Sequence, residues 1–242
     1  MTTLKPAWYS NKRHGIFSDL ISLLHPPYTL WHLSYILIGV SMAPTIYLDR
    51  SVAVLFAFFL GLGIGAHALD ETMGNPLQTR LSKKSLYVIG FSALFAAIAI
   101  GLYYVYALSV LILPFVLIES FFALAYNLEM FQSKFHSDLV FALSWGSIPY
   151  LTGYFVNALS ISLATIVMAV GIGLLTFVQR TLSTQARLWR RKMEPVKSMK
   201  LSSGKEVNVS SSELISPAEK SLKALTIMIF LVAIALVLAR LH

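Results

Sequence analysis

Polar side chains that could bind a metal ion follow a long apolar segment, in the stretch G65-AHALDETMGNPLQTRL-S82. His67, Asp70 and Glu71 share one helical face, because residues three and four positions apart are neighbours on a helix surface. Two adjacent carboxylates repel each other unless they share a cation, and a Mg²⁺ ion bound to a phosphate suits them. We therefore expect Asp70 and Glu71 to hold Mg²⁺, with a polar helix end among lipid headgroups as the alternative.

The helix that carries this cluster should end directly after it. Asn75 precedes Pro76, and a residue before proline disfavours the helical conformation. The chain then turns into a loop that contains Arg80. We expect Asn75 and Arg80 to border the same cavity as the acidic pair.

A second polar cluster follows a later apolar segment, in A125-YNLEMFQSKFHS-D138. Glu119 and Tyr126 are seven residues apart, so they share a helical face, and Asn127 comes directly after them. Glu119 lies deep in the apolar segment, where an ionisable group is costly and is usually functional. We expect Glu119 either to serve the site or to form a polar contact between helices.

Two histidines bracket the start of the first apolar segment, in H25-PPYTLWH-L33. His25 and His32 are seven residues apart and can line one cavity. The alternative for each is a packed histidine near the membrane interface.

The composition indicates which elements must hold these side chains in place. The chain has 242 residues, of which 57% are hydrophobic and only 12% are charged. Soluble domains have about 25% charged residues, whereas apolar segments of about 18–25 residues span a bilayer core of about 30 Å. The sequence predicts an all-α polytopic membrane bundle that forms one integral membrane domain over residues 1–242. Seven spans are expected, at about 31–48, 51–69, 86–106, 108–126, 138–156, 159–179 and 219–240.

The basic residues set the expected orientation. With the N-terminus in the cytoplasm, 17 of the 19 Lys and Arg residues lie inside, and only Arg50 and Arg240 lie outside. This asymmetry follows the positive-inside rule, so the net charge of +8 reflects topology and no nucleic-acid partner is expected. We expect a multi-pass protein of the cell membrane with its C-terminus outside. The chain has no cysteine, which excludes disulfides and thiol chemistry.

The segment 180–218 is predicted to be a polar, basic cytoplasmic loop before the last helix. Its basic run R187-LWRR-K192 either lies against anionic headgroups or is an ordinary flank of a membrane span. The following residues around Gly204 indicate a short hairpin or no regular structure. Ser216-Pro217-Ala218-Glu219 has the pattern of a capping box, which predicts that the final helix begins there.

Four segments follow one another in a specific order: H25-PPY-T29, H67-ALDETMG-N75 leading to T79-RL-S82, Y126-NLEMFQS-K134, and W145-GSIPYLTG-Y154. In order and spacing they resemble the UbiA superfamily of intramembrane prenyltransferases, over about residues 25–185. The resemblance implies a UbiA-like helical bundle whose acidic segments hold Mg²⁺ against the diphosphate of a polyprenyl donor. The metal neutralises the leaving group, and a lipophilic acceptor attacks the allylic carbocation.

The chain departs from the pattern of this superfamily in two places. His67, Ala68, Glu71 and Asn75 stand where the family has Asn, Asp, Asp and Asp, and a one-residue shift counts Asp70 among the ligands instead. The second acidic motif is absent, because residues 177–192 contain no Asp or Glu. One helix stands where the family has its last three.

If the protein is an active enzyme, each candidate residue has an expected role. Arg180 or Arg187 would replace the second metal site by pairing directly with phosphate. The expected catalytic residues are His67, Asp70, Glu71 and Tyr126. The expected substrate-binding residues are Asn75, Arg80, Glu119, Asn127, Lys134, Arg180 and Arg187.

Two functions are consistent with these features. The first is a divergent prenyltransferase acting on a polyprenyl diphosphate and a lipophilic acceptor within membrane lipids. The second is a non-catalytic protein of the same fold that binds a lipid or quinone or acts as an assembly partner, which the missing acidic motif favours. A transporter is the weaker third class, because no pair of broken helices in corresponding halves is evident.

Overall fold

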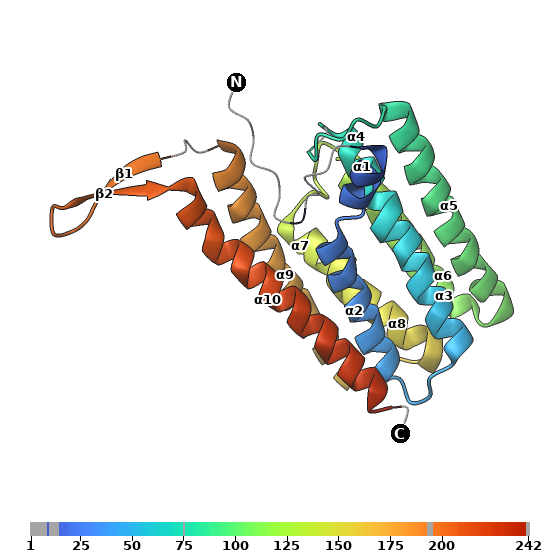
Figure 1. Cartoon of the computed structure of the whole chain (residues 1–242). Helices are drawn as coiled ribbons and strands as arrows, with labels where there is room; N and C mark the ends of the chain where they lie inside the picture. The colour runs from blue at the N-terminus through green and yellow to red at the C-terminus, as the bar shows by residue number, and fades with distance from the viewer. Residues whose placement is uncertain (1–8, 10–14, 75, 193–195, 241–242) are drawn as a thin grey trace.

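The computed structural model describes residue 9 and residues 15–74, 76–192 and 196–240. Within them the chain is a bundle of helices with one two-stranded hairpin (Figure 1). Two of the helical segments, η1 and η3, are π-helical, and η2 is a single 3₁₀ turn. The elements are α1 (Ile16–Leu23), α2 (Pro26–Met42), α3 (Leu48–Phe58), η1 (Phe59–Ala66), α4 (His67–Thr72), α5 (Lys83–Ala107), η2 (Val110–Ile112), α6 (Leu113–Asn127), α7 (Asp138–Ala142), η3 (Leu143–Ser147), α8 (Ile148–Ala158), α9 (Leu163–Lys192), β1 (Val196–Lys200), β2 (Glu206–Ser210) and α10 (Ser211–Leu238).

Six helical segments among the described residues are long and apolar enough to cross a membrane. They correspond to six of the seven expected spans. The first expected span is the shorter α2, whose 17 residues extend about 26 Å at about 1.5 Å per residue. The six segments are Leu48–Thr72, Lys83–Ala107, Val110–Asn127, Asp138–Ala158, Leu163–Arg190 and Ser212–Leu238.

Two of these segments change helix type partway along. The segment from Leu48 to Thr72 passes from α3 through the π-helical η1 into α4. The segment from Asp138 to Ala158 passes from α7 through the π-helical η3 into α8. A π-helical turn widens the helix and is frequent at functional sites. The two π-helical turns lie beside the polar residues discussed below.

Helix α2 lies at the centre of the bundle, where it packs against α8 and α10. Its residues Trp31, Tyr35 and Ile36 are fully buried. Glycines allow the backbones of α2 and α8 to approach closely. A Cβ atom on Gly39 would collide with the carbonyl oxygen of Tyr150, and a Cβ atom on Gly153 would collide with backbone of α2. This close packing fixes α2 against the segment that contains η3.

The end of the chain differs from the loop expected over residues 180–218. Helix α9 continues to Lys192, because no Gly or Pro interrupts residues 174–192. Strands β1 and β2 then form an antiparallel hairpin that extends away from the bundle (Figure 1). Helix α10 begins at Ser211, so the expected start at Ser216–Glu219 is wrong. The capping box is formed instead by Ser210 and Glu213, which have the same spacing, and Pro217 lies inside the helix.

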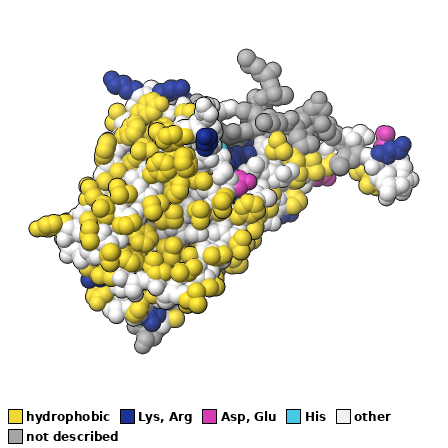
Figure 2. Space-filling view, turned by 180° about the vertical axis from the view of Figure 1, so that it is seen from behind, with side chains coloured by type: hydrophobic (Ala, Val, Ile, Leu, Met, Phe, Trp, Pro, Cys, Tyr) yellow, Lys and Arg dark blue, Asp and Glu magenta, His cyan; other side chains and the backbone are white. Residues whose placement is uncertain are grey.

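The surface of the bundle is apolar between its two ends. Hydrophobic side chains cover most of the face shown in Figure 2, and Lys and Arg side chains lie toward its edges. Large apolar residues such as Phe95, Leu163 and Leu174 are mostly exposed. Such a surface is typical of a protein that contacts lipid, since soluble monomers rarely expose large apolar patches.

Candidate functional site

A cavity lined mainly by polar and aromatic side chains lies where α2, α4, α6, α7 and α9 meet. We call it the polar cavity, and its volume is about 180 Å³. The described residues that line it include three arginines and one aspartate, so their net charge is positive. Its lining residues are Tyr9, His25, Tyr28, His32, His67, Asp70, Pro76, Leu77, Gln78, Tyr126, Asn127, His136, Phe141, Trp145, Gln179, Arg180, Ser183, Arg187 and Arg190.

The two π-helical turns bring side chains into the polar cavity. His67 directly follows η1, and its Nδ1 lies 3.1 Å from the carbonyl oxygen of Gly63 within that turn. Trp145 lies in η3, and its carbonyl oxygen is 2.6 Å from Nδ1 of His32. Each π-helical turn therefore supplies a backbone carbonyl that holds a histidine ring in place, and a cavity residue lies within the turn (Trp145) or directly after it (His67).

Stacked rings form one wall of the polar cavity. The ring of His25 stacks on His67 with centroids 4.3 Å apart, and His67 stacks on Trp145 with centroids 5.5 Å apart. Trp145 also stacks on Phe141. Because His25 and Trp145 come from distant parts of the chain, this stack joins α2, α4 and η3 around the cavity. The histidines therefore line the cavity together.

Helix α9 forms the basic wall. Gln179, Ser183, Arg187 and Arg190 recur every three or four residues, which places them on one helical face, with Arg180 beside them. All five line the polar cavity.

Two of the three arginines on this wall are paired with acids. Arg180 forms a salt bridge with Asp138 (3.2 Å), and Arg190 forms one with Glu219 (2.6 Å). Arg187 donates to the hydroxyl of Thr184 at 3.4 Å. Among the described residues, no acid lies within salt-bridge distance of Arg187. Its positive charge is therefore the one most available to a ligand in the polar cavity.

Two buried polar atoms beside these arginines have no hydrogen-bond partner within the described part of the chain. They are the hydroxyl of Tyr126 and Oε1 of Gln179, and both residues line the polar cavity. A buried polar group without a partner costs about 1–3 kcal/mol. Such groups call for a ligand, ion or water that completes their hydrogen bonds.

Six of the residues expected from the sequence lie in the polar cavity. Asn127 is buried there and donates to the carbonyl oxygen of Ala123 at 2.8 Å. Arg180 lies over the ring of Phe141, 5.1 Å from its centroid. Residues at the ends of α4 and α6 thus line the same cavity as residues of α9. The six are His67, Asp70, Tyr126, Asn127, Arg180 and Arg187.

Glu71 does not lie in the polar cavity, contrary to expectation. Its Oε2 accepts a hydrogen bond from the backbone N–H of Leu77 (2.9 Å). Its Oε1 accepts from the backbone N–H of Thr79 (3.1 Å) and from the Thr79 hydroxyl (2.9 Å). With both oxygens engaged, Glu71 holds the loop after α4 against the bundle. The arrangement does not fit a Mg²⁺ ion held by Asp70 and Glu71 together, and the described residues contain no cluster of three metal-ligating side chains.

Three other expected residues also lie outside the polar cavity, and a fourth cannot be placed. Arg80 forms a 3.0 Å salt bridge with Asp19 at the surface, and Lys134 is exposed. Glu119 lines a separate apolar cavity. Asn75 lies outside the described residues. The spacing of these residues in the sequence did not show which residues they contact in the folded chain.

The sequence also left residues of the polar cavity unassigned. His136 stacks on Tyr126 with ring centroids 4.4 Å apart, and its Nε2 lies 3.4 Å from Arg180. Gln179 and Arg190 complete the face of α9 that Arg187 shares. The three- and four-residue spacing of this face was present in the sequence and could have identified both. His25 and His32, for which packing was the alternative, do line the cavity.

Comparisons with known proteins do not assign this chain to a family. No protein-family model matches it, and neither the curated proteins nor the solved structures give a match.

Proposed function

We propose that the polar cavity binds the diphosphate headgroup of a polyprenyl lipid. The observation that carries this proposal is the position of Arg187, which has no acid partner among the described residues and lies in a cavity with two unpaired polar atoms. An arginine fork pairs with two phosphate oxygens at once. The Tyr126 hydroxyl can donate to a third oxygen.

We further propose that the protein is a divergent UbiA-like prenyltransferase. In prenyl transfer the allylic C–O bond breaks, and its electron pair leaves with the diphosphate. The acceptor then bonds to the allylic carbon and loses a proton. Arg180 and Arg187 would stabilise the leaving diphosphate. Asp70, the one carboxylate among the described residues that line the cavity, would accept the proton. The faces of Tyr126 and Trp145 suit a carbocation, since aromatic rings attract positive charge.

Magnesium would have a smaller role here than the resemblance implies. In the part of the chain that the structure describes, Asp70 is the only carboxylate that lines the polar cavity, because Glu71 holds the following loop. A Mg²⁺ ion that arrives with a diphosphate would therefore meet a single carboxylate ligand. Fixed arginines would supply the remaining positive charge.

Binding without transfer is the second candidate function. It is favoured by the engagement of both Glu71 oxygens and by the absence of acids from residues 177–192. In that case the protein would hold a diphosphate lipid or a quinone-like lipid, or serve as an assembly partner.

The proposed setting is the cell membrane, with the N-terminus and the polar cavity on the cytoplasmic side and the C-terminus outside. In this orientation 17 of the 19 Lys and Arg residues lie on the cytoplasmic side, which supports it by the positive-inside rule. We propose α2 as the seventh span. Helix α2 packs between α8 and α10. Although it is slightly shorter than the bilayer core, it therefore need not contact lipid along its whole length.

The experiment that tests the function uses the purified full-length protein in detergent. Lipids that co-purify are identified by mass spectrometry, and turnover of prenyl diphosphates is measured with and without Mg²⁺. Transfer of the prenyl group supports the enzyme. Bound diphosphate lipid without turnover supports the binding protein, and neither bound lipid nor turnover contradicts both.

A further inference from the structure

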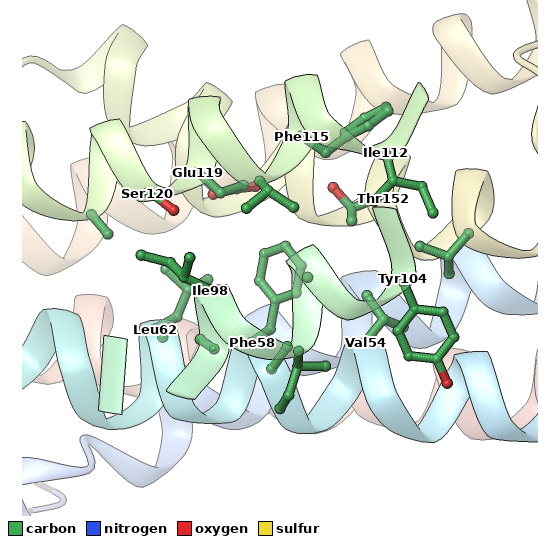
Figure 3. A pocket seen from close by; sticks show the side chains of 18 of the residues that line it. Val54, Phe58, Leu62, Ile98, Tyr104, Ile112, Phe115, Glu119, Ser120 and Thr152 are labelled. Carbon is green, nitrogen blue, oxygen red and sulfur yellow. The ribbon is translucent and has the colours of Figure 1, made fainter. Parts of the chain in front are cut away.

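A second cavity lies between α3, η1, α5 and α6, apart from the polar cavity. We call it the apolar cavity, and its volume is about 100 Å³. Its walls are almost entirely hydrophobic and include Phe58, Leu62, Ile98 and Phe115 (Figure 3). None of the described residues lines both this cavity and the polar cavity. A ligand in one cavity therefore does not occupy the other.

One acid lies among these apolar walls. Figure 3 shows Glu119 on α6 with its carboxyl group in the cavity. Its Oε1 is buried and has no hydrogen-bond partner among the described residues. Burying a charged or hydrogen-bonding group without a partner is costly, and an ionisable residue at membrane depth usually has a functional role. A ligand that brings a donor and a positive charge would remove that cost.

The other charged residue of the apolar cavity is already engaged. Arg50 lies over the ring of Tyr47, 3.8 Å from its centroid, and donates to the carbonyl oxygen of Val156 at 3.4 Å. No salt bridge joins Arg50 to Glu119 in the part of the chain that the structure describes. The carboxyl group of Glu119 therefore remains without a cation from the protein there.

We propose that the apolar cavity is a binding site for a lipophilic amine, with Glu119 pairing with its ammonium group. The ammonium supplies both the N–H donors and the positive charge that the carboxyl group lacks, and a hydrocarbon or aromatic body matches the walls. Helices α5 and α6 leave much of their surface exposed. An amine dissolved in the bilayer thus meets the helices that line the site. This site is independent of the diphosphate site proposed above.

A matched pair of ligands tests the proposal on the full-length protein in detergent. Binding of 4-phenylbutylamine and 4-phenylbutanol, which differ only in the headgroup, is measured by native mass spectrometry. We expect the wild-type protein to bind the amine about tenfold more tightly than the alcohol, since a hydrogen bond to a charged group is the stronger one. Glu119→Gln keeps the shape of the side chain and removes its charge, so this preference should disappear.

Two further variants locate the bound amine. Ala97→Phe fills the apolar cavity that Ala97 lines and should abolish binding of both ligands. Asp70→Asn alters only the polar cavity and should leave the preference unchanged. The proposal is wrong if the wild-type protein does not bind the amine, if Glu119→Gln retains the preference, or if Asp70→Asn removes it. These results do not depend on diphosphate binding, so the two proposals can fail separately.

Discussion

The carboxylate of Glu71 accepts hydrogen bonds from both the backbone N–H and the hydroxyl of Thr79. This contact joins the last turn of α4 to the loop that follows it, at the edge of the polar cavity. Glu71 therefore has a structural role, although it is adjacent to Asp70 in the sequence. Asp70, one position earlier, lines the cavity.

Replacement of Glu71 should therefore act on stability and not on metal binding. We expect Glu71→Ala to lower the free energy of unfolding by at least about 2 kcal/mol, because the Leu77 N–H and the buried N–H and hydroxyl of Thr79 lose the carboxylate that accepts their hydrogen bonds. The melting temperature, measured in detergent with and without Mg²⁺, checks this. Asp70→Asn is the control and should change the melting temperature less. A Glu71→Ala protein that melts like the wild type but loses affinity for Mg²⁺ would contradict the structural role.

The contact between α2 and α8 should be sensitive to one added methyl group. A Cβ atom on Gly39 would collide with the carbonyl oxygen of Tyr150 and lie 2.9 Å from the backbone nitrogen of Tyr154. We expect Gly39→Ala to destabilise the protein by about 1–3 kcal/mol, as overpacking does. Gly171→Ala is the matched control, because nothing lies within 4 Å of the added Cβ atom. Thermal unfolding of both variants gives the comparison, and equal melting temperatures would rule out the tight contact.

The hydroxyl of Tyr126 should matter to the ligand and not to the fold. It has no hydrogen-bond partner among the described residues, so Tyr126→Phe should leave the melting temperature of the ligand-free protein unchanged or slightly raised. Loss of a hydrogen bond to a charged group should weaken prenyl-diphosphate binding about tenfold. Tyr104→Phe, in the apolar cavity, serves as the control and should bind normally. A large loss of stability without a change in affinity would show that the hydroxyl is structural.

The orientation can be measured because the chain contains no cysteine. Single cysteines introduced by Asp49→Cys and Ser203→Cys place one label near each end of the bundle. On intact cells we expect a membrane-impermeant maleimide to label the first position and not the second. The reverse pattern would show that the N-terminus lies outside and that the basic residues do not face the cytoplasm.

The sequence was sufficient for the helices and for part of the polar cavity. Apolar segments predicted the six helices that are long enough to cross a membrane, since such a helix satisfies its own backbone hydrogen bonds within lipid. Arg180 and Arg187 are expected from the sequence to bind phosphate, although the sequence predicts that both lie in a loop and the structure shows them on α9. The neighbouring helix termini placed Asp70 and Tyr126 at the same end of the bundle, where the structure brings them together.

The spacing of residues in the sequence could not show which distant residues each polar side chain contacts in the folded chain. Asp70 and Glu71 are adjacent in the sequence. The carboxylate of Glu71 nevertheless accepts hydrogen bonds from the loop at Thr79, whereas Asp70 lines the polar cavity. Glu119 shares a helical face with Tyr126. The two residues nevertheless line different cavities, because Glu119 lies in the apolar cavity and Tyr126 in the polar cavity. Similarly, two segments fit the capping-box pattern, and α10 uses the earlier one, with Ser210 as its N-cap.

The central claim is that Arg187 binds a diphosphate headgroup in the polar cavity. The most direct measurement is the affinity of the detergent-purified protein for farnesyl diphosphate, compared between Arg187→Ala and Arg80→Ala. Arg80 is the matched control, because it is paired with Asp19 at the surface outside the cavity. We expect Arg187→Ala to weaken binding by about tenfold or more, at least as much as Asp70→Ala, and Arg80→Ala to leave it unchanged. Equal affinity of the wild type and Arg187→Ala, or no binding by the wild type, would contradict the claim.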